Sequence, residues 1–132
     1  MEQNSDFRYD LRIGVMSEII IGQLLTSRTV EVKMDFGVHK TGNFYIEYSS
    51  RGKPSGIANT EADYWILIGA SEEGLRHRYE DVAVDESDIM YFITIPTERL
   101  KHLCRTKYFL KDVEGGDNNT SLGVLIKATD LL

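Results

Sequence analysis

Two short stretches of this 132-residue chain carry the side chains best suited to chemistry. Polar and apolar residues alternate over residues 28–36, where the polar set includes Lys33 and Asp35, and again over residues 43–50, which include Glu47. Carboxylate oxygens suit Mg²⁺, which needs only one or two of them and keeps several waters. Metal-bound water is a good nucleophile at neutral pH, and a neighbouring lysine can orient it or stabilise charge that develops on a phosphate.

The alternation predicts two half-buried strands, joined as a hairpin by a turn over residues 37–42. If both apolar faces enter one core, parity places Lys33 near Glu47, with Asp35 about one residue pair away and Glu31 on the same face. The alternative is a solvated face on which Lys33 and Glu47 form an ion pair worth at most about 1 kcal/mol.

The other segments are expected to complete one domain over residues 1–132, of α/β or α+β class. Helical spacing of apolar residues, continuous apolar runs and turn residues indicate the order of the elements. We expect a helix at 8–25, the hairpin, a loop at 51–59, a helical turn at 60–63, a strand at 64–70, an exposed charged segment at 71–87, a strand at 89–95, a helix at 97–107 capped by Thr97, strands at 108–113 and 122–127, and between them a Gly-Gly-Asp-Asn-Asn loop at 115–119.

Composition constrains the partners and the location. The formal net charge of −6 argues mildly against a nucleic-acid partner without excluding a local basic patch. Cys104 is the one cysteine, which rules out an intramolecular disulfide and predicts a core residue in a reducing compartment. The first residues lack the features of a signal peptide, and the apolar runs are too short for a bilayer, so we expect a cytoplasmic protein without a membrane partner.

The order of these residues resembles a known family. A helix with Glu18, a strand that ends near Asp35, and Glu47 at the start of Glu-Tyr-Ser on the next strand are similar to the core of the PD-(D/E)XK nucleases, which include restriction enzymes and Holliday junction resolvases. The stretches 41–48, from Thr-Gly-Asn-Phe to Glu-Tyr, and 52–65, which includes Gly-Lys-Pro-Ser-Gly-Ile, resemble small nuclease-like proteins encoded by bacteriophages.

The resemblance implies a restriction-endonuclease-like core, with a mixed β-sheet flanked by helices. It implies an endonuclease that hydrolyses DNA phosphodiesters with Mg²⁺ or Mn²⁺, on branched or repair DNA, in the cytoplasm of a phage host. Asp35 and Glu47 would then bind the metal, Lys33 would act on the attacking water, and Glu18 would support the site. Cleavage of both strands would be easiest for a two-fold homodimer.

One departure from the family pattern leaves a second reading open. Ser49 stands where the motif has lysine, so Lys33 on the neighbouring strand, or Lys53 in the following loop, must replace it. If neither lysine reaches the metal, the chain is an inactive module on a nuclease scaffold that binds DNA or a protein. A rival alignment takes residues 31–33 as Glu-x-Lys, but it lacks an upstream motif aspartate at a suitable distance.

The loops near the expected site supply candidate DNA contacts. Lys40, Arg51 and Lys53 could bind backbone phosphates. Ser55 could do the same or cap the turn that follows it. The role of residues 115–119 is open between a turn and a ligand contact.

Overall fold

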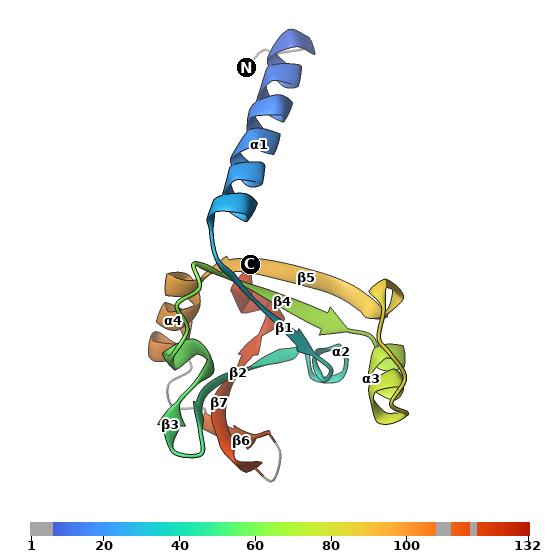
Figure 1. Cartoon of the computed structure of the whole chain (residues 1–132), viewed down its shortest axis with the longest axis vertical. Helices are drawn as coiled ribbons and strands as arrows, with labels where there is room; N and C mark the ends of the chain where they lie inside the picture. Colours follow the sequence, from blue (N-terminus) through green and yellow to red (C-terminus); the bar gives the residue numbers. More distant parts are fainter. Residues whose placement is uncertain (1–6, 108–111, 117–118) are drawn as a thin grey trace.

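The computed structural model describes residues 7–107, 112–116 and 119–132. The helices are α1 (Phe7–Ser27), α2 (Val38–Thr41), α3 (Glu72–Tyr79) and α4 (Thr97–Thr106). The strands are β1 (Val30–Asp35), β2 (Asn43–Ser50), β3 (Lys53–Pro54), β4 (Tyr64–Ala70), β5 (Ile89–Pro96), β6 (Asp112–Gly115) and β7 (Ser121–Lys127). Short 3₁₀ turns lie at Gly56–Ala58, Glu86–Asp88 and Ala128–Leu131. The fold is mixed α and β, with helices beside the sheets, as expected from the sequence (Figure 1).

The strands form two sheets rather than one. The first has the order β1-β4-β5, with β1 parallel and β5 antiparallel to β4. The second has the order β3-β2-β7-β6 and is antiparallel throughout. The predicted hairpin is therefore wrong, because β1 and β2 belong to different sheets. The one-turn helix α2 redirects the chain between them, and it ends at Gly42 in the left-handed conformation, with φ of 75°.

The side chains of β1 also face the opposite way from our expectation, with the polar set on the inner face of the sheet and the apolar set on the outer face. In the parallel register Lys33 lies beside Leu67, which is buried, so the polar set of β1 is on the inner face of its sheet. Val32 pairs with Ile66 and remains 54% exposed on the outer face. The parity argument assumed one core for both strands, and it fails for β1 because a third strand, β4, supplies the buried residues.

One hydrophobic core lies between the sheets and under α4. Phe44 and Ile46 of β2 are buried as predicted, and Trp65 of β4 packs into the same cluster. Its other buried members are Val38, Ile57, Leu67, Ile95, Leu100, Val124, Ile126 and Leu131. Cys104 of α4 is half-buried against this cluster, as expected, and burial raises the pKa of its thiol to about 11.

Two local predictions before and after β4 are wrong. Residues 60–63 are not helical. Instead, Asp63 accepts hydrogen bonds from the backbone N–H and hydroxyl of Thr29, and its own N–H donates to the Thr29 carbonyl. Thr97 does not cap α4. It is buried, and its hydroxyl donates to the Ala62 carbonyl at 2.6 Å. This hydrogen bond holds the start of α4 against the loop before β4.

The charged segment after β4 contains a helix that the sequence pattern did not predict. Ser71 caps α3 by accepting a hydrogen bond from the Gly74 N–H at 3.0 Å. The predicted strand at 108–113 falls partly on residues 108–111, which lie outside the described residues, and β6 accounts for its last two positions.

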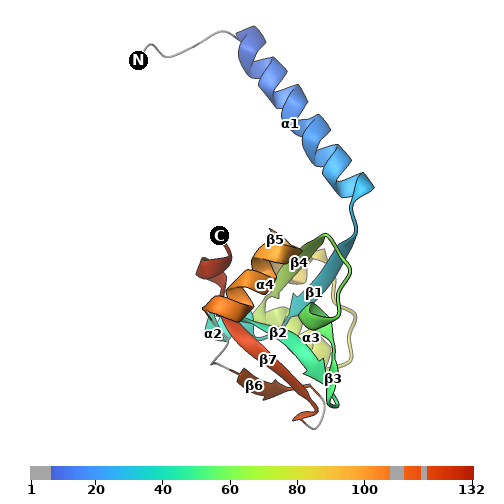
Figure 2. The ribbon, with the colours of Figure 1, turned by 90° about the vertical axis from the view of Figure 1, so that its left-hand side faces the viewer.

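Helix α1 extends away from the two sheets, and both views show it projecting from the rest of the chain (Figures 1 and 2). All its residues are exposed except Leu24, which is half-buried. Within the described residues, no helix has the length and apolar content needed to cross a membrane.

Candidate functional site

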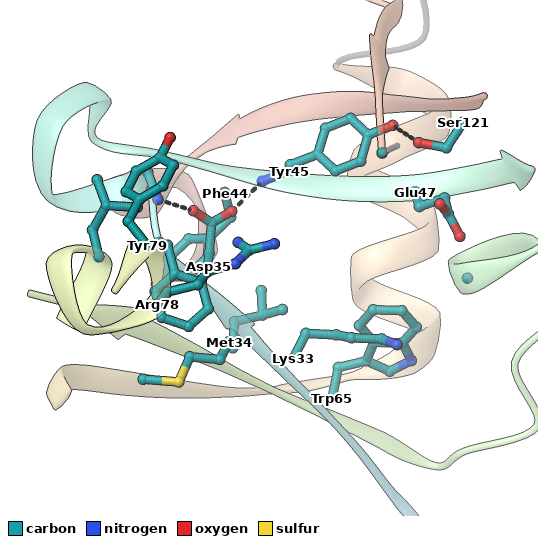
Figure 3. Close-up of a pocket in the computed structure, with 16 residues that line it drawn as sticks. Lys33, Met34, Asp35, Phe44, Tyr45, Glu47, Trp65, Arg78, Tyr79 and Ser121 are labelled. Carbon is teal, nitrogen blue, oxygen red and sulfur yellow. Dashed lines mark hydrogen bonds between the residues drawn. The ribbon is translucent and has the colours of Figure 1, made fainter. Parts of the chain in front are cut away.

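A pocket of about 570 Å³ opens between the two sheets, beside α3 (Figure 3). Lys33, Asp35 and Glu47, the three residues that carried the sequence hypothesis, all line it. The other lining residues are Met34, Phe36, Gly37, Phe44, Tyr45, Gly56, Trp65, Leu67, Leu75, Arg78, Tyr79, Gly116 and Ser121. The pocket thus brings the predicted residues together across two sheets instead of across one hairpin.

Asp35 is held at the end of β1 by three backbone groups. Its Oδ1 accepts hydrogen bonds from the N–H groups of Gly37 and Val38, at 2.8 and 3.1 Å. Its Oδ2 accepts from the Tyr45 N–H of β2 at 2.9 Å. The carboxylate therefore starts α2 and also joins the two sheets, and Figure 3 shows it against β2 at one side of the pocket.

Glu47 is held from the other side by the loop after β3. The Ser55 hydroxyl donates to Glu47 Oε2 at 2.9 Å. The next residue, Gly56, has φ of +52°, and a Cβ there would lie 2.2 Å from the Glu47 carbonyl oxygen. Only glycine fits such an approach. Ser55 makes no capping hydrogen bond to the 3₁₀ turn, so the predicted capping role is wrong.

A bulge in β2 follows Glu47. Glu47 pairs with Gly123 of β7, whereas Ser49 pairs with the adjacent Leu122, which leaves Tyr48 as the extra residue. Bulges redirect side chains and occur often beside functional sites. Ser49, at the position of the motif lysine, is not among the residues that line the pocket.

Lys33 and Trp65 form the wall opposite β2. Lys33 pairs with Glu31 at 3.0 Å, and not with Glu47 as the solvated-face alternative expected. Trp65 is 2% exposed, and its indole Nε1 has no hydrogen-bond partner in the part of the chain that the structure describes. Figure 3 shows the two side chains next to each other. A buried donor without a partner is costly, and it is often explained by a bound ligand or water.

The glycine-rich segment makes room for Tyr45. A Cβ at Gly115 or at Gly123 would lie 2.7 Å from the Tyr45 ring. The Tyr45 hydroxyl shares a 2.7 Å hydrogen bond with the Ser121 hydroxyl. Part of the predicted loop, residues 117–118, lies outside the described residues. Gly116 lines the pocket.

The other predicted residues lie elsewhere. Glu18 is on α1, which extends away from the sheets, so it does not join Asp35 and Glu47 within one chain. Lys40, Arg51 and Lys53 are exposed and do not line the pocket. Arg51 has φ of 52°, and its N–H donates to the Thr120 carbonyl.

Arg78, which the sequence analysis did not select, is the second cation of the pocket. Its guanidinium carbon lies 4.8 Å from the centre of the Phe36 ring, a cation–π contact. The run Arg76-His77-Arg78 was visible as charge, but only a predicted α3 would have shown which residue turns inward.

Asp35 and Glu47 carry the kind of ligand that Mg²⁺ prefers. Within the described residues there is no cluster of three or more His, Cys, Asp or Glu side chains that could hold a metal. Mg²⁺ needs only one or two carboxylates, and each carboxylate oxygen has two acceptor positions. Asp35 Oδ1 uses both positions and Oδ2 uses one, so Oδ2 and the Glu47 carboxylate keep free acceptor positions.

Comparison with known proteins adds no relative to this picture. No protein-family model, curated protein or solved structure matches the chain.

Proposed function

We propose that this protein is a Mg²⁺-dependent DNA endonuclease of the PD-(D/E)XK type and that phosphodiester hydrolysis takes place in the pocket between the sheets. The observation that supports this proposal best is the convergence of Lys33, Asp35 and Glu47 on that pocket from strands of different sheets. If these residues only formed a solvated face of one sheet, they would not meet in a cavity between two sheets.

The proposed roles of Asp35, Glu47 and Lys33 follow from their positions in the pocket. Asp35 and Glu47 would hold the ion, each fixed by hydrogen bonds that set its orientation before any ligand binds. When bound, Mg²⁺ supplies Lewis acidity towards phosphate oxygens and lowers the pKa of its water. Lys33 would orient the attacking water or stabilise negative charge on the phosphate.

Donors in the pocket suit an anionic substrate in spite of the acidic chain. Lys33 and Arg78 bring positive charge to the lining, and the buried Trp65 Nε1–H lacks an acceptor among the described residues. A phosphate oxygen is a suitable acceptor for charged donors such as Lys33 and Arg78. A local site of this kind explains how a chain with a net charge of −6 can bind DNA.

The decisive test compares Glu47→Gln with wild type in calorimetric titrations of Mg²⁺ and Mn²⁺ and in cleavage assays on plasmid and branched DNA. Glutamine keeps an acceptor for Ser55 but removes the charge, so the melting temperature should stay near that of wild type while metal binding and cleavage are lost. Glu98→Gln, at a side chain that is 84% exposed on α4, is the matched control and should behave as wild type. Equal cleavage by Glu47→Gln would refute the proposal.

A catalytically inactive module that binds DNA is the second candidate. Two observations favour it: Ser49 replaces the motif lysine, and three backbone N–H groups already occupy the Asp35 carboxylate. This candidate predicts a gel shift of branched DNA that survives EDTA, with no cleavage at any concentration of Mg²⁺ or Mn²⁺.

A further inference from the structure

Helix α1 presents apolar side chains to solvent on all its sides. Ile19, Ile20 and Ile21 follow one another, so they point about 100° apart around the helix axis, and each is more than half exposed. Seven other large apolar residues of α1 are exposed as well: Phe7, Tyr9, Leu11, Ile13, Val15, Met16 and Leu25. A helix that is apolar all round is normally buried.

The outer face of the β1-β4-β5 sheet is the second uncovered apolar surface. Val32 of β1 lies beside Ile66 of β4, and Ile68 of β4 lies beside Phe92 of β5. Phe92 is 63% exposed and Val32 is 54% exposed, while both isoleucines are half-buried. Figures 1 and 2 show α1 directed away from this sheet. Monomeric proteins rarely leave apolar patches of this extent uncovered.

The connection between the helix and the sheet is short and anchored at one end. Thr29 is fixed by its hydrogen bonds with Asp63, so the direction of α1 is set at Arg28, the one residue between Ser27 and Thr29. Folding back onto its own sheet would cover one side of α1. Because the isoleucines cover more than half of the circumference, the opposite side would stay in water.

A second copy can cover the sheet face and one side of α1, and contact between the two helices can cover the other side. Helix α1 has 21 residues and is about 32 Å long, so its side wall measures roughly 1,000 Å². The receiving face of three strands with 6 to 8 residues measures roughly 14 by 23 Å, or about 330 Å². The two helices and two sheet faces together therefore lose about 1,300 Å². Stable, specific interfaces bury about 1,200–2,000 Å² in total. A two-fold exchange of this type is closed, and it also brings the two helices near each other.

The geometry points to a homodimer in which α1 of each chain packs on the outer face of the β1-β4-β5 sheet of the other chain. Val32 and Phe92 form the centre of the receiving surface, and Ile20 belongs to the inserted helix. This assignment does not depend on the nuclease proposal, because the pocket opens on the inner face of the same sheet.

The test is the mass of the full chain in solution, measured by light scattering coupled to size-exclusion chromatography over a range of protein concentrations. Wild type should have twice the 15.0 kDa of one chain. The double variant Val32→Glu/Phe92→Glu should have the mass of one chain, because these residues are exposed within a single chain and its fold does not need them. Ile20→Glu, on the helix, should have the same effect.

Leu122→Glu is the matched control. Leu122 is also an exposed apolar strand residue, but it lies on β7 in the other sheet, so this variant should remain a dimer. Wild type at 15.0 kDa at all concentrations would overturn the proposal and would favour a helix folded onto its own sheet. A dimer that persists in Val32→Glu/Phe92→Glu would also overturn it, because α1 would then associate without the sheet.

Discussion

The Ser55 hydroxyl donates a 2.9 Å hydrogen bond to Glu47 Oε2, and this bond fixes a pocket carboxylate from a loop that lies next to it in space. We predict that Ser55→Ala leaves the fold intact and weakens Mg²⁺ binding about 10- to 100-fold, as is typical when the partner of a ligand is removed. Isothermal titration calorimetry measures the change. Ser55→Thr keeps a hydroxyl and should retain most of the affinity, whereas equal losses in both variants would contradict this role.

Gly56 should tolerate substitution far less than Gly52. Both have positive φ, at 52° and 78°, but a Cβ at Gly52 meets no atom within 4 Å, whereas one at Gly56 meets the Glu47 carbonyl at 2.2 Å. We expect Gly52→Ala to cost about 1–2 kcal/mol through backbone strain alone. Gly56→Ala adds overpacking and should cost roughly 3–5 kcal/mol. Urea unfolding of both variants gives the difference, and similar midpoints would show that the close approach does not occur.

Local patterns were sufficient for the strands with the strongest signals. The alternation over residues 43–50 and the continuous apolar run over residues 64–70 predicted β2 and β4 with the bounds that the structure has. Pairing was not local. The partner of β1 depends on β4, which is about 30 residues away, and alternation says which residues share a face but not which face is buried.

The residues of the candidate site also fall into those that could be predicted from local sequence and those that could not. Lys33, Asp35 and Glu47 were chosen by residue type, and they line one pocket although the hairpin that was to join them does not exist. Trp65 and Arg78 could not be chosen, because their roles depend on tertiary contacts: a donor left without a partner and a helix turned towards the pocket. The apolar run that predicted β4 did not show that the Trp65 donor lacks a partner, and the charged segment that contains Arg78 did not show that this residue faces the pocket.

Asp35 should contribute to stability as well as to the site. Asp35→Ala removes the acceptor of three backbone N–H groups, from Gly37, Val38 and Tyr45. Each unsatisfied donor costs about 1–3 kcal/mol when it is buried. The Gly37 donor is exposed and the other two are partly buried, so we expect a total loss of about 2–4 kcal/mol. Asp35→Asn keeps one oxygen and should lose about half as much in chemical denaturation. Equal stability of Asp35→Ala and wild type would contradict the bridging role.

The unpartnered indole of Trp65 should bind a ligand acceptor. Trp65→Phe removes the Nε1 donor but keeps an aromatic ring in the core, so we expect a melting temperature within a few degrees of that of wild type. Binding of a short DNA duplex, measured by fluorescence anisotropy of a labelled strand in Ca²⁺, should weaken about 10-fold, as one lost hydrogen bond with a charged oxygen implies. Unchanged affinity would show that Nε1 does not contact the substrate.

The His77–Asp88 pair should make stability depend on pH. His77 Nδ1 lies 3.0 Å from Asp88 Oδ2, and its Nε2 lies 3.2 Å from Glu73 Oε1. The hydrogen bond with Asp88 raises the pKa of His77 above its usual 6.5, and the same bond lowers the pKa of Asp88 below its usual 3.8. Asp88 is 1% exposed, so its charge relies on this partner and on the Asp85 N–H, which donates to it.

The direction of the pH dependence of stability follows from the two pKa shifts. The contribution of His77 is complete below pH 6.5 and is lost as the pH rises through its raised pKa, whereas that of Asp88 is complete above pH 3.8 and is lost as the pH falls through its lowered pKa. The pair therefore stabilises the fold most between these values. Thermal melts from pH 5 to 9 should show a steeper fall in melting temperature for wild type than for His77→Gln, whose amide can donate to Asp88 at every pH. Parallel curves for the two proteins would mean that the charge on His77 does not stabilise the fold.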